Sequence, residues 1–289
     1  MKLSSPHSLW RVARVLASFG FAAVATTVLA DDWAPNLTAA ATWHSNATLA
    51  DRSSDQLESL QLHADLLAGE RYPVGRDDAL HLTAHFAGDW WPRYHALTRG
   101  AAGGRAEWRH QFGPDPRALV VALEGSADFV EARERARRGF ATGVAATARK
   151  RFDDFTRVTL RHQVIWFNAR YATFDSAGSE TSLEFDRDLT PKTRLTFAAR
   201  FRDGDIVTYA SGVRPDLEDR APNRMELDTF DRLMTAYRID ATTWSGRAAL
   251  VRALDESSAI VVSYEYRNTI RGPLRFPNHL LSVALVHQF

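Results

Sequence analysis

The chain has 289 residues, of which 45% are apolar, with a mean hydropathy of -0.30 and a formal net charge of +1. This composition excludes a polytopic helical membrane protein, a wholly disordered chain and bulk electrostatic binding of nucleic acid. The absence of cysteine excludes disulfides, thiol catalysis, cysteine-ligated zinc and a lipid-modified N-terminal cysteine.

The N-terminal segment predicts a secretory signal peptide. Lys2, Arg11 and Arg14 precede an apolar run over residues 15–29. Val28 and Ala30 are small residues at the two positions that a signal peptidase recognises, so cleavage is expected after Ala30. A single transmembrane anchor is the weaker alternative, because a spanning helix needs about 20 apolar residues. We therefore expect a signal peptide over residues 1–30 and one exported domain over residues 31–289.

From there on, apolar and polar residues alternate along the chain, which is the pattern of half-buried β-strands. Leu123, Gly125 and Ala127, for example, alternate with Glu124, Ser126 and Asp128. The pattern predicts twelve strands at 36–48, 56–67, 78–90, 103–112, 118–129, 139–151, 155–167, 179–189, 193–203, 243–254, 258–268 and 277–289.

The connections between these segments alternate between short turns and longer polar stretches. Two of them depart from this scheme, since 68–77 is longer than expected for a turn and 91–103 is irregular and rich in glycine. The stretch 204–242 is interpreted as one long loop. If it formed a hairpin of two further strands, the count would rise to fourteen.

An even number of strands of about 11 residues, joined by alternating short and long connections, predicts an all-β fold, an antiparallel transmembrane β-barrel. Tryptophans near strand ends fit the aromatic girdles of such barrels; they are Trp33, Trp43, Trp90, Trp91, Trp108, Trp166 and Trp244. The alternative is a secreted soluble β-sandwich that acts as a binding protein, with the same alternation facing a core.

The last strand carries a further signal, because Leu281, Val283, Leu285 and Phe289 share one face and the chain stops at the aromatic residue. In this the chain resembles Gram-negative, and in particular uncharacterised proteobacterial, outer-membrane β-barrel proteins. The resemblance implies an outer-membrane location, contact with outer-membrane lipids, and recognition of Phe289 by the barrel-assembly machinery.

If the apolar face meets lipid, the opposite face lines the lumen. Neighbouring strands then present basic and acidic side chains in turn; the predicted lumen network comprises Arg157, Arg161, Glu184, Asp186, Asp188, Arg194, Arg200, Arg202, Glu124 and Asp128. One interpretation is a narrow anion-selective channel, similar to small twelve-stranded porins for acidic sugars. The other, which the alternating sign favours, is a self-neutralising network that fills the lumen.

Candidate catalytic and metal-binding residues are few. His63, His81 and His85 are weak metal candidates, and we expect no metal, no cofactor and no catalytic residue. His44 and Ser45 loosely resemble the His-x-Ser-Asn-Gly motif of outer-membrane phospholipase A. The motif needs one intervening residue so that both side chains share a face, and here the two are adjacent.

The predicted function is therefore a structural or transport role in the outer membrane, as a small barrel or narrow solute channel. The alternatives are a lipid-modifying hydrolase, the membrane domain of a secretion or surface-assembly system, and the soluble sandwich. The charged run 131–138 is expected to be an outer loop whose Arg133, Arg135 and Arg137 contact lipopolysaccharide phosphates. No nucleic-acid partner is expected, and the sequence does not define an oligomeric state.

Overall fold

The computed structural model describes residues 34–212 and 214–289, so the predicted signal peptide and Trp33 lie outside the described residues. Twelve antiparallel strands form a closed barrel, which confirms the predicted fold class and strand count. The barrel strands are β1 (Ala34–His44), β2 (Ser59–Pro73), β3 (Asp78–Trp90), β4 (Arg99–Gln111), β5 (Val120–Ala132), β6 (Gly139–Arg151), β7 (Thr156–Ala169), β8 (Ser176–Thr190), β9 (Thr193–Ala210), β11 (Met234–Ala253), β12 (Ser258–Arg271) and β13 (Leu274–Gln288).

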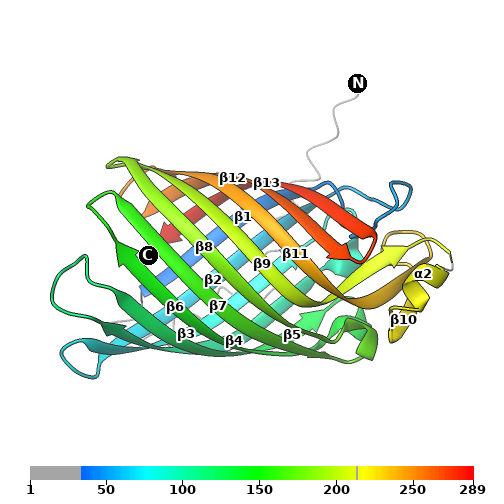
Figure 1. Cartoon of the computed structure of the whole chain (residues 1–289), viewed down its shortest axis with the longest axis horizontal. Coiled ribbons are helices and arrows are strands. Elements are labelled where there is room, and N and C mark those ends of the chain that lie inside the picture. The colour runs from blue at the N-terminus through cyan, green and yellow to red at the C-terminus, as the bar shows by residue number, and fades with distance from the viewer. Residues whose placement is uncertain (1–33, 213) are drawn as a thin grey trace. The chain divides into compact units, whose positions relative to one another are not determined.

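The barrel closes where the last strand pairs with the first. The ladder between β1 and β13 runs from Asn36 opposite Gln288 to His44 opposite Leu280. The backbone N–H of Phe289 adds a hydrogen bond of 3.0 Å to the carbonyl oxygen of Pro35. The start of β1 and the end of β13 therefore lie at the same end of the barrel, which we call the turn end (Figure 1).

The outer surface of the barrel is apolar, because alternate residues along each strand point away from the lumen. Leu123, Val144, Leu183 and Val283 are each about half exposed, as expected for side chains that meet lipid instead of a protein core. At the turn end the exposed aromatic side chains include Phe112, Phe152 and Phe155. No helix within the described ranges is both long enough and apolar enough to cross a membrane.

Two predicted connections are shorter than the sequence suggested. β2 continues to Pro73, so residues 74–77 alone form the turn that the sequence placed at 68–77. β4 begins at Arg99, so only residues 91–98 remain of the predicted connection 91–103. Glycines weaken the alternation signal without interrupting the ladder, and this hid the first part of β4.

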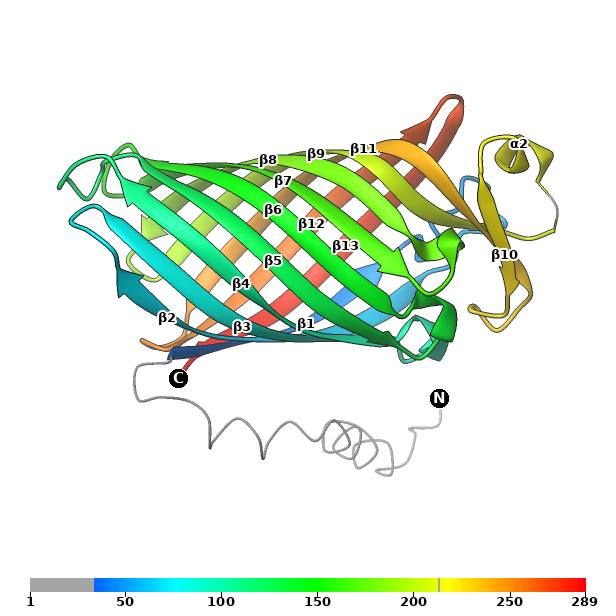
Figure 2. The ribbon, with the colours of Figure 1, turned by 90° about the horizontal axis from the view of Figure 1, so that it is seen from below.

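The opposite end, the loop end, carries the largest departure from the sequence prediction. β9 runs to Ala210 and β11 begins at Met234, so both strands penetrate the predicted 204–242 loop. Between them lie α2 (Pro215–Glu218) and β10 (Asn223–Leu227), which pairs only with β11. Figure 2 shows α2 and β10 beyond the barrel wall. Parts of the stretch 204–242 do form paired strands, but they extend β9 and β11 or pair with β11 outside the barrel. None of them adds a strand to the barrel, so the fourteen-strand alternative is wrong.

A glycine marks the point where β9 leaves the wall. Gly204 has φ +142°, a region that residues with a Cβ rarely adopt. A Cβ there would lie 2.3 Å from the carbonyl oxygen of Ala177, and the pairing of β9 with β8 stops at Gly178 opposite Gly204. Beyond this point β11 is the only barrel strand that pairs with β9. We call the paired segments, residues 205–210 and 234–240, the arm.

The outward orientation of β8 can be tested at Leu183, near the middle of the strand. We expect Leu183→Arg to lower the free energy of unfolding by about 2–4 kcal/mol, because a cation would face hydrocarbon. Urea unfolding in lipid vesicles, followed by heat-modifiable gel mobility, measures the change. Leu183→Met is the matched control and should have much less effect. Equal stability of the Arg variant and the wild type would contradict a lipid-facing Leu183.

Candidate functional site

An apolar cluster covers the loop end of the lumen. We call it the cap, and its buried members are Tyr94, Leu97, Ala136, Phe174, Tyr209, Phe230, Met234 and Ala236. They come from the connections 91–98, 133–138 and 170–175, from the loop before β11, and from the arm. The ring of Phe230 lies edge-on between Tyr94 and Tyr209, with centroids 5.0 and 4.9 Å away. Side chains from many loops thus pack together at this end of the barrel.

The first connection, residues 45–58, also joins the cap. It contacts the free edge of β9, where the carbonyl oxygen of Thr48 accepts a hydrogen bond from Tyr209 N–H at 3.1 Å. The hydroxyl of Thr208 donates to the carbonyl oxygen of Leu49. Asn46 holds the loop in shape, because its side chain binds both the N–H and the C=O of Ala50. The arm and the first loop therefore meet over the lumen.

Arg214 fastens the helix α2 to that first loop. It is 2% exposed, and its guanidinium makes two parallel hydrogen bonds of 2.9 and 3.0 Å to Asp51 and two more to Asp216. These partners raise the pKa of Arg214, and its hydrogen bonds lower the pKa of Asp216. Leu217 of α2 packs beside it in a second cluster with Tyr237. We call the Arg214, Asp51 and Asp216 group the latch.

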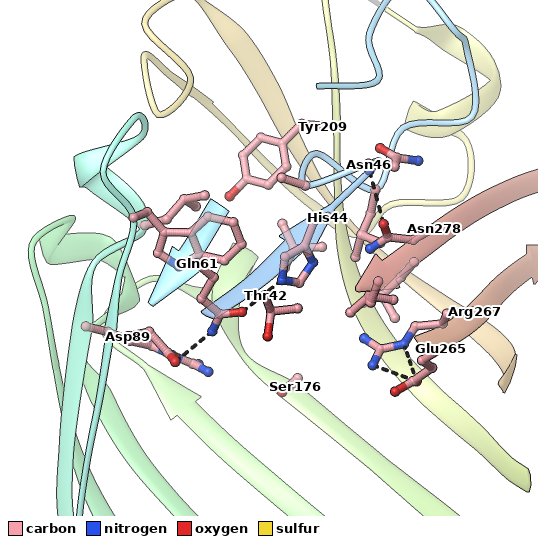
Figure 3. Close-up of a pocket in the computed structure, with 18 of the residues that line it drawn as sticks. Thr42, His44, Asn46, Gln61, Asp89, Ser176, Tyr209, Glu265, Arg267 and Asn278 are labelled. Carbon is pink, nitrogen blue, oxygen red and sulfur yellow. Dashed lines mark hydrogen bonds and ion pairs between the residues drawn. The ribbon is translucent and has the colours of Figure 1, made fainter. Parts of the chain in front are cut away.

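Beneath the cap lies a cavity of about 620 Å³, which we call the chamber (Figure 3). Tyr209 of the cap stands at one side of it, and His44, Gln61 and Asp89 at another. A second cavity of about 550 Å³ lies further along the lumen. The two share the lining residues Arg99, Phe167, Ser176 and Arg202, so they are neighbours within the lumen.

A chain of hydrogen bonds crosses four strands in the wall of the chamber. Asp89 accepts from the Gln61 amide at 2.7 Å, from the Arg99 Nε at 2.7 Å and from His63 at 2.8 Å. Because its NH2 group is engaged, Gln61 presents its carbonyl oxygen to His44 Nε2 at 2.9 Å. His44 must therefore carry a proton on Nε2. This network joins five polar side chains, and all of them except His63 line the chamber.

The structure places the ten predicted network residues on the lumen side of β5 and β7–β9. Arg157 binds Asp186 at 2.6 Å, Arg161 binds Glu124 at 2.8 Å and Arg194 binds Asp188 at 2.6 Å. Asp128 pairs with His85 at 2.9 Å, and Arg200 lies 3.8 Å from Glu265 of β12. Arg202 and Glu184 have no ion-pair partner within 4.0 Å among the described residues. Most of these charges are therefore compensated, and a few are not.

One of the unexpected glycines of β4 has a role in this network. Gly103 stands between His85 on β3 and Asp128 on β5 in the strand register. A Cβ at this position would lie 2.3 Å from the Asp128 Oδ1 atom that binds His85. Glycine therefore lets the two side chains meet across an intervening strand, which the sequence pattern alone did not reveal.

The wall opposite these charges is different in kind. Over residues 38–42 of β1 and 280–286 of β13, the side chains that face the lumen are small, hydroxylic or aliphatic, namely Leu280, Ser282, Ala284, Val286, Thr38, Ala40 and Thr42. His44 and Asn278, which lie nearer the loop end of the same strands, are the polar exceptions. Thr42 and Ser282 bind each other at 3.0 Å, so even their hydroxyl groups are engaged. Short side chains here leave the room that the chamber occupies, since Thr42, Leu280 and Ser282 line it.

The three histidines considered as metal ligands occupy separate places. His63 pairs with Asp89, and His85 pairs with Asp65 and Asp128. His81 lies four residues along β3 from His85, a distance of about 13 Å in a strand. No group of three or more potential ligands with metal-site geometry occurs among residues 34–212 and 214–289.

His44 and Ser45 are also apart. His44 faces the chamber, whereas the hydroxyl of Ser45 accepts a hydrogen bond of 2.8 Å from the backbone N–H of His279 and contacts Asn278. A hydrolase of the phospholipase kind needs the imidazole to take the proton of the hydroxyl. The two side chains share no hydrogen bond, so this pair lacks the geometry for that step.

The charged loop 131–138 divides in two. Arg133 and Arg135 are exposed, and their contact with lipopolysaccharide stays a prediction. Arg137 instead lies over the rings of Phe174 and Tyr209, 4.9 and 5.6 Å from their centroids, and lines the chamber. The prediction that Arg137 contacts lipid phosphates therefore does not fit its position. The alternation of Arg and other residues could not show which side of the loop faces inward.

Comparisons with known proteins support the architecture and nothing finer. No family model and no curated protein matches the chain. The NanC porin is 7% identical over 88% of this chain and 100% of its own, with a TM-score of 0.50. The KdgM porin is 10% identical over 88% of this chain and 99% of its own, with a TM-score of 0.48. The CymD monoaromatic hydrocarbon channel is 10% identical over 90% of this chain and 89% of its own, with a TM-score of 0.46. The chain has the fold of an outer-membrane β-barrel.

The latch can be tested by removing one of its carboxylates. Asp51→Asn should weaken the contact between α2 and the first loop by about 2 kcal/mol, the value of hydrogen bonds to a charged group. We expect limited proteolysis within residues 211–233 to accelerate roughly 30-fold. Asp154→Asn, which removes an exposed ion pair with Arg117, is the control and should change nothing. An unchanged cleavage rate for Asp51→Asn would show that the latch does not hold this segment.

The latch also predicts a pH dependence. The pKa of Asp216 in the folded protein lies below its ordinary value, so its stabilising effect is present above that ordinary value and is lost as the pH falls through the lowered one. Cleavage of residues 211–233 by pepsin, relative to the Asp216→Asn variant, should rise only below about pH 4. A rise that begins near pH 6 would assign the loosening to a histidine instead.

Proposed function

We propose that the protein is a gated outer-membrane channel for small polar solutes. The observation that carries the proposal is a pair of neighbouring cavities in the lumen, about 620 and 550 Å³, which are lined by polar and apolar side chains and lie beneath loops that form the cap. A barrel with a purely structural role has no need of open, polar-lined space inside it. Polar side chains such as His44, Gln61 and Arg99 line the chamber, where a solute in the lumen could contact them.

The apolar outer surface supports an outer-membrane location. Barrels of this kind have short turns on the periplasmic side and longer loops outside the cell. By that rule the cap and the latch face the exterior, and the turn end, with the start of β1 and the end of β13, faces the periplasm. Phe289 then stands at the periplasmic rim, where we propose that the assembly machinery recognises it.

The cap has the properties of a gate because it is held differently from the wall. The wall is a continuous backbone ladder, which cannot open in lipid without leaving N–H and C=O groups unpaired. The cap depends on ring packing around Phe230 and on a few side-chain bonds such as those of Arg214. Loss of such contacts costs a few kcal/mol, which is in the range that a solute or a fluctuation can supply.

A sealed structural barrel is the second candidate, supported by the ion pairs that cross the lumen. The hydrolase alternative has less support, since His44 and Ser45 do not meet. Because the first two candidates differ only in whether the lumen conducts, an electrical measurement separates them.

We expect purified wild-type protein in a planar bilayer to show rare openings, and Phe230→Ala to open far more often. Removing the central ring of the cap costs about 3 kcal/mol, equivalent to a roughly 100-fold change in open probability. The conductance of a single open channel should stay the same, because the wall is unchanged. Phe129→Ala, on the lipid face and 57% exposed, is the control. Silence of both the wild type and Phe230→Ala would overturn the proposal in favour of a sealed barrel.

A further inference from the structure

Arg137 is a cation in the cap without an anionic partner. It is the last residue of the short 3-10 helix η2 (Arg135–Arg137) and points inward, where the rings of Phe174 and Tyr209 flank its guanidinium. No carboxylate of the described residues lies within ion-pair distance, and its buried Nε atom has no hydrogen-bond partner. Burial and the neighbouring charge of Arg99 lower the pKa of Arg137 to about 10, so it is still charged at neutral pH. A buried donor of this kind is unfavourable unless something else binds it.

Arg99 presents a second donor group to the same space. Its Nε binds Asp89 at 2.7 Å, yet its side chain is 61% exposed although it points into the barrel. Its outer nitrogens therefore border open lumen. Arg99 and Arg137 both line the chamber, and the positive charge of Arg99 lowers the pKa of Arg137. Two arginines that line one cavity and have free donors form an arrangement that can bind an anion.

The charge balance of the chamber agrees with this. Its lining includes the arginines Arg99, Arg137, Arg202, Arg247 and Arg267, and the acids Asp89, Asp205 and Glu265. Arg202 donates only to the backbone oxygen of Asp205, and Arg247 has no ion-pair partner within 4.0 Å in the described part of the chain. The chamber therefore has an excess of positive charge, and this excess is located on arginines that have no carboxylate as an ion-pair partner.

We propose that the chamber binds a small organic carboxylate, with its carboxylate group between Arg137 and Arg99. This inference depends on the proposed function, in that it names the class of solute for the same lumen. A planar carboxylate accepts paired hydrogen bonds from guanidinium groups. Trp91, Leu97 and Phe167 line the same cavity and provide an apolar surface for the body of the solute. A volume of about 620 Å³ is sufficient for a molecule of drug-like size.

The test compares benzoate with benzamide, which match in shape and differ in charge. The protein, residues 31–289, is refolded in detergent in the presence of each probe, so that a closed cap does not prevent entry. The thermal unfolding temperature and the calorimetric affinity are then measured. Benzoate should bind and raise the unfolding temperature, and benzamide should not. Arg137→Gln should weaken benzoate binding at least tenfold, Arg137→Lys should restore part of it, and the exposed-loop control Arg133→Gln should bind as the wild type does.

Inorganic phosphate is the third probe, since it shares the negative charge but lacks an apolar body. Binding of phosphate as tight as that of benzoate would overturn the assignment of a carboxylate with an apolar body. Equal binding of benzoate and benzamide, or no binding of benzoate, would overturn the anion site itself. Bilayer conductance of Phe230→Ala is measured separately, so a channel that conducts without binding benzoate would refute this inference and leave the proposed function intact.

Discussion

The structure depends on one constraint, the need to pair every backbone N–H and C=O group of a strand that lies in hydrocarbon. The ladder between β1 and β13 meets it by joining the two ends of the sheet. Once the sheet is closed, alternate residues must face lipid or lumen, and this fixes the apolar outside and the polar inside. The site follows from the same constraint, since a wall with no free edge leaves only loops and side chains to close or open the lumen.

This constraint also explains what the sequence could predict. The strands, their number and the direction of each side chain follow from period two, and the ion pairs of Arg157 with Asp186 and of Arg161 with Glu124 join residues that the pattern had placed on the lumen side. Errors arose where the local signal was weak. Gly100 and Gly103 interrupted the alternation of β4 without interrupting the strand, and β9 and β11 continued beyond the membrane where no lipid face is required.

The cap could not be predicted for a different reason. Its members come from loops that are far apart in the sequence, and Tyr94, Phe174 and Phe230 meet only because the barrel brings its loops around one opening. Arg137 illustrates the difficulty, because a run of arginines in a loop ordinarily indicates a solvated surface. Only the position of the rings of Phe174 and Tyr209 shows that one of these arginines turns inward. Tertiary placement, and not local pattern, decides the chemistry of such residues.

The neutral wall formed by β13 and β1 has a consequence for any molecule in the lumen. Side chains such as Ala284 and Thr42 stand on one side, and arginines and carboxylates stand on the other. Charged groups that can bind a solute are therefore available on one side of the lumen instead of all around it. A solute with a dipole moment would be turned as it enters, with one end held toward the charged strands. Such alignment restricts tumbling, so the barrel would discriminate among isomers of equal size and equal net charge by the direction of their dipoles.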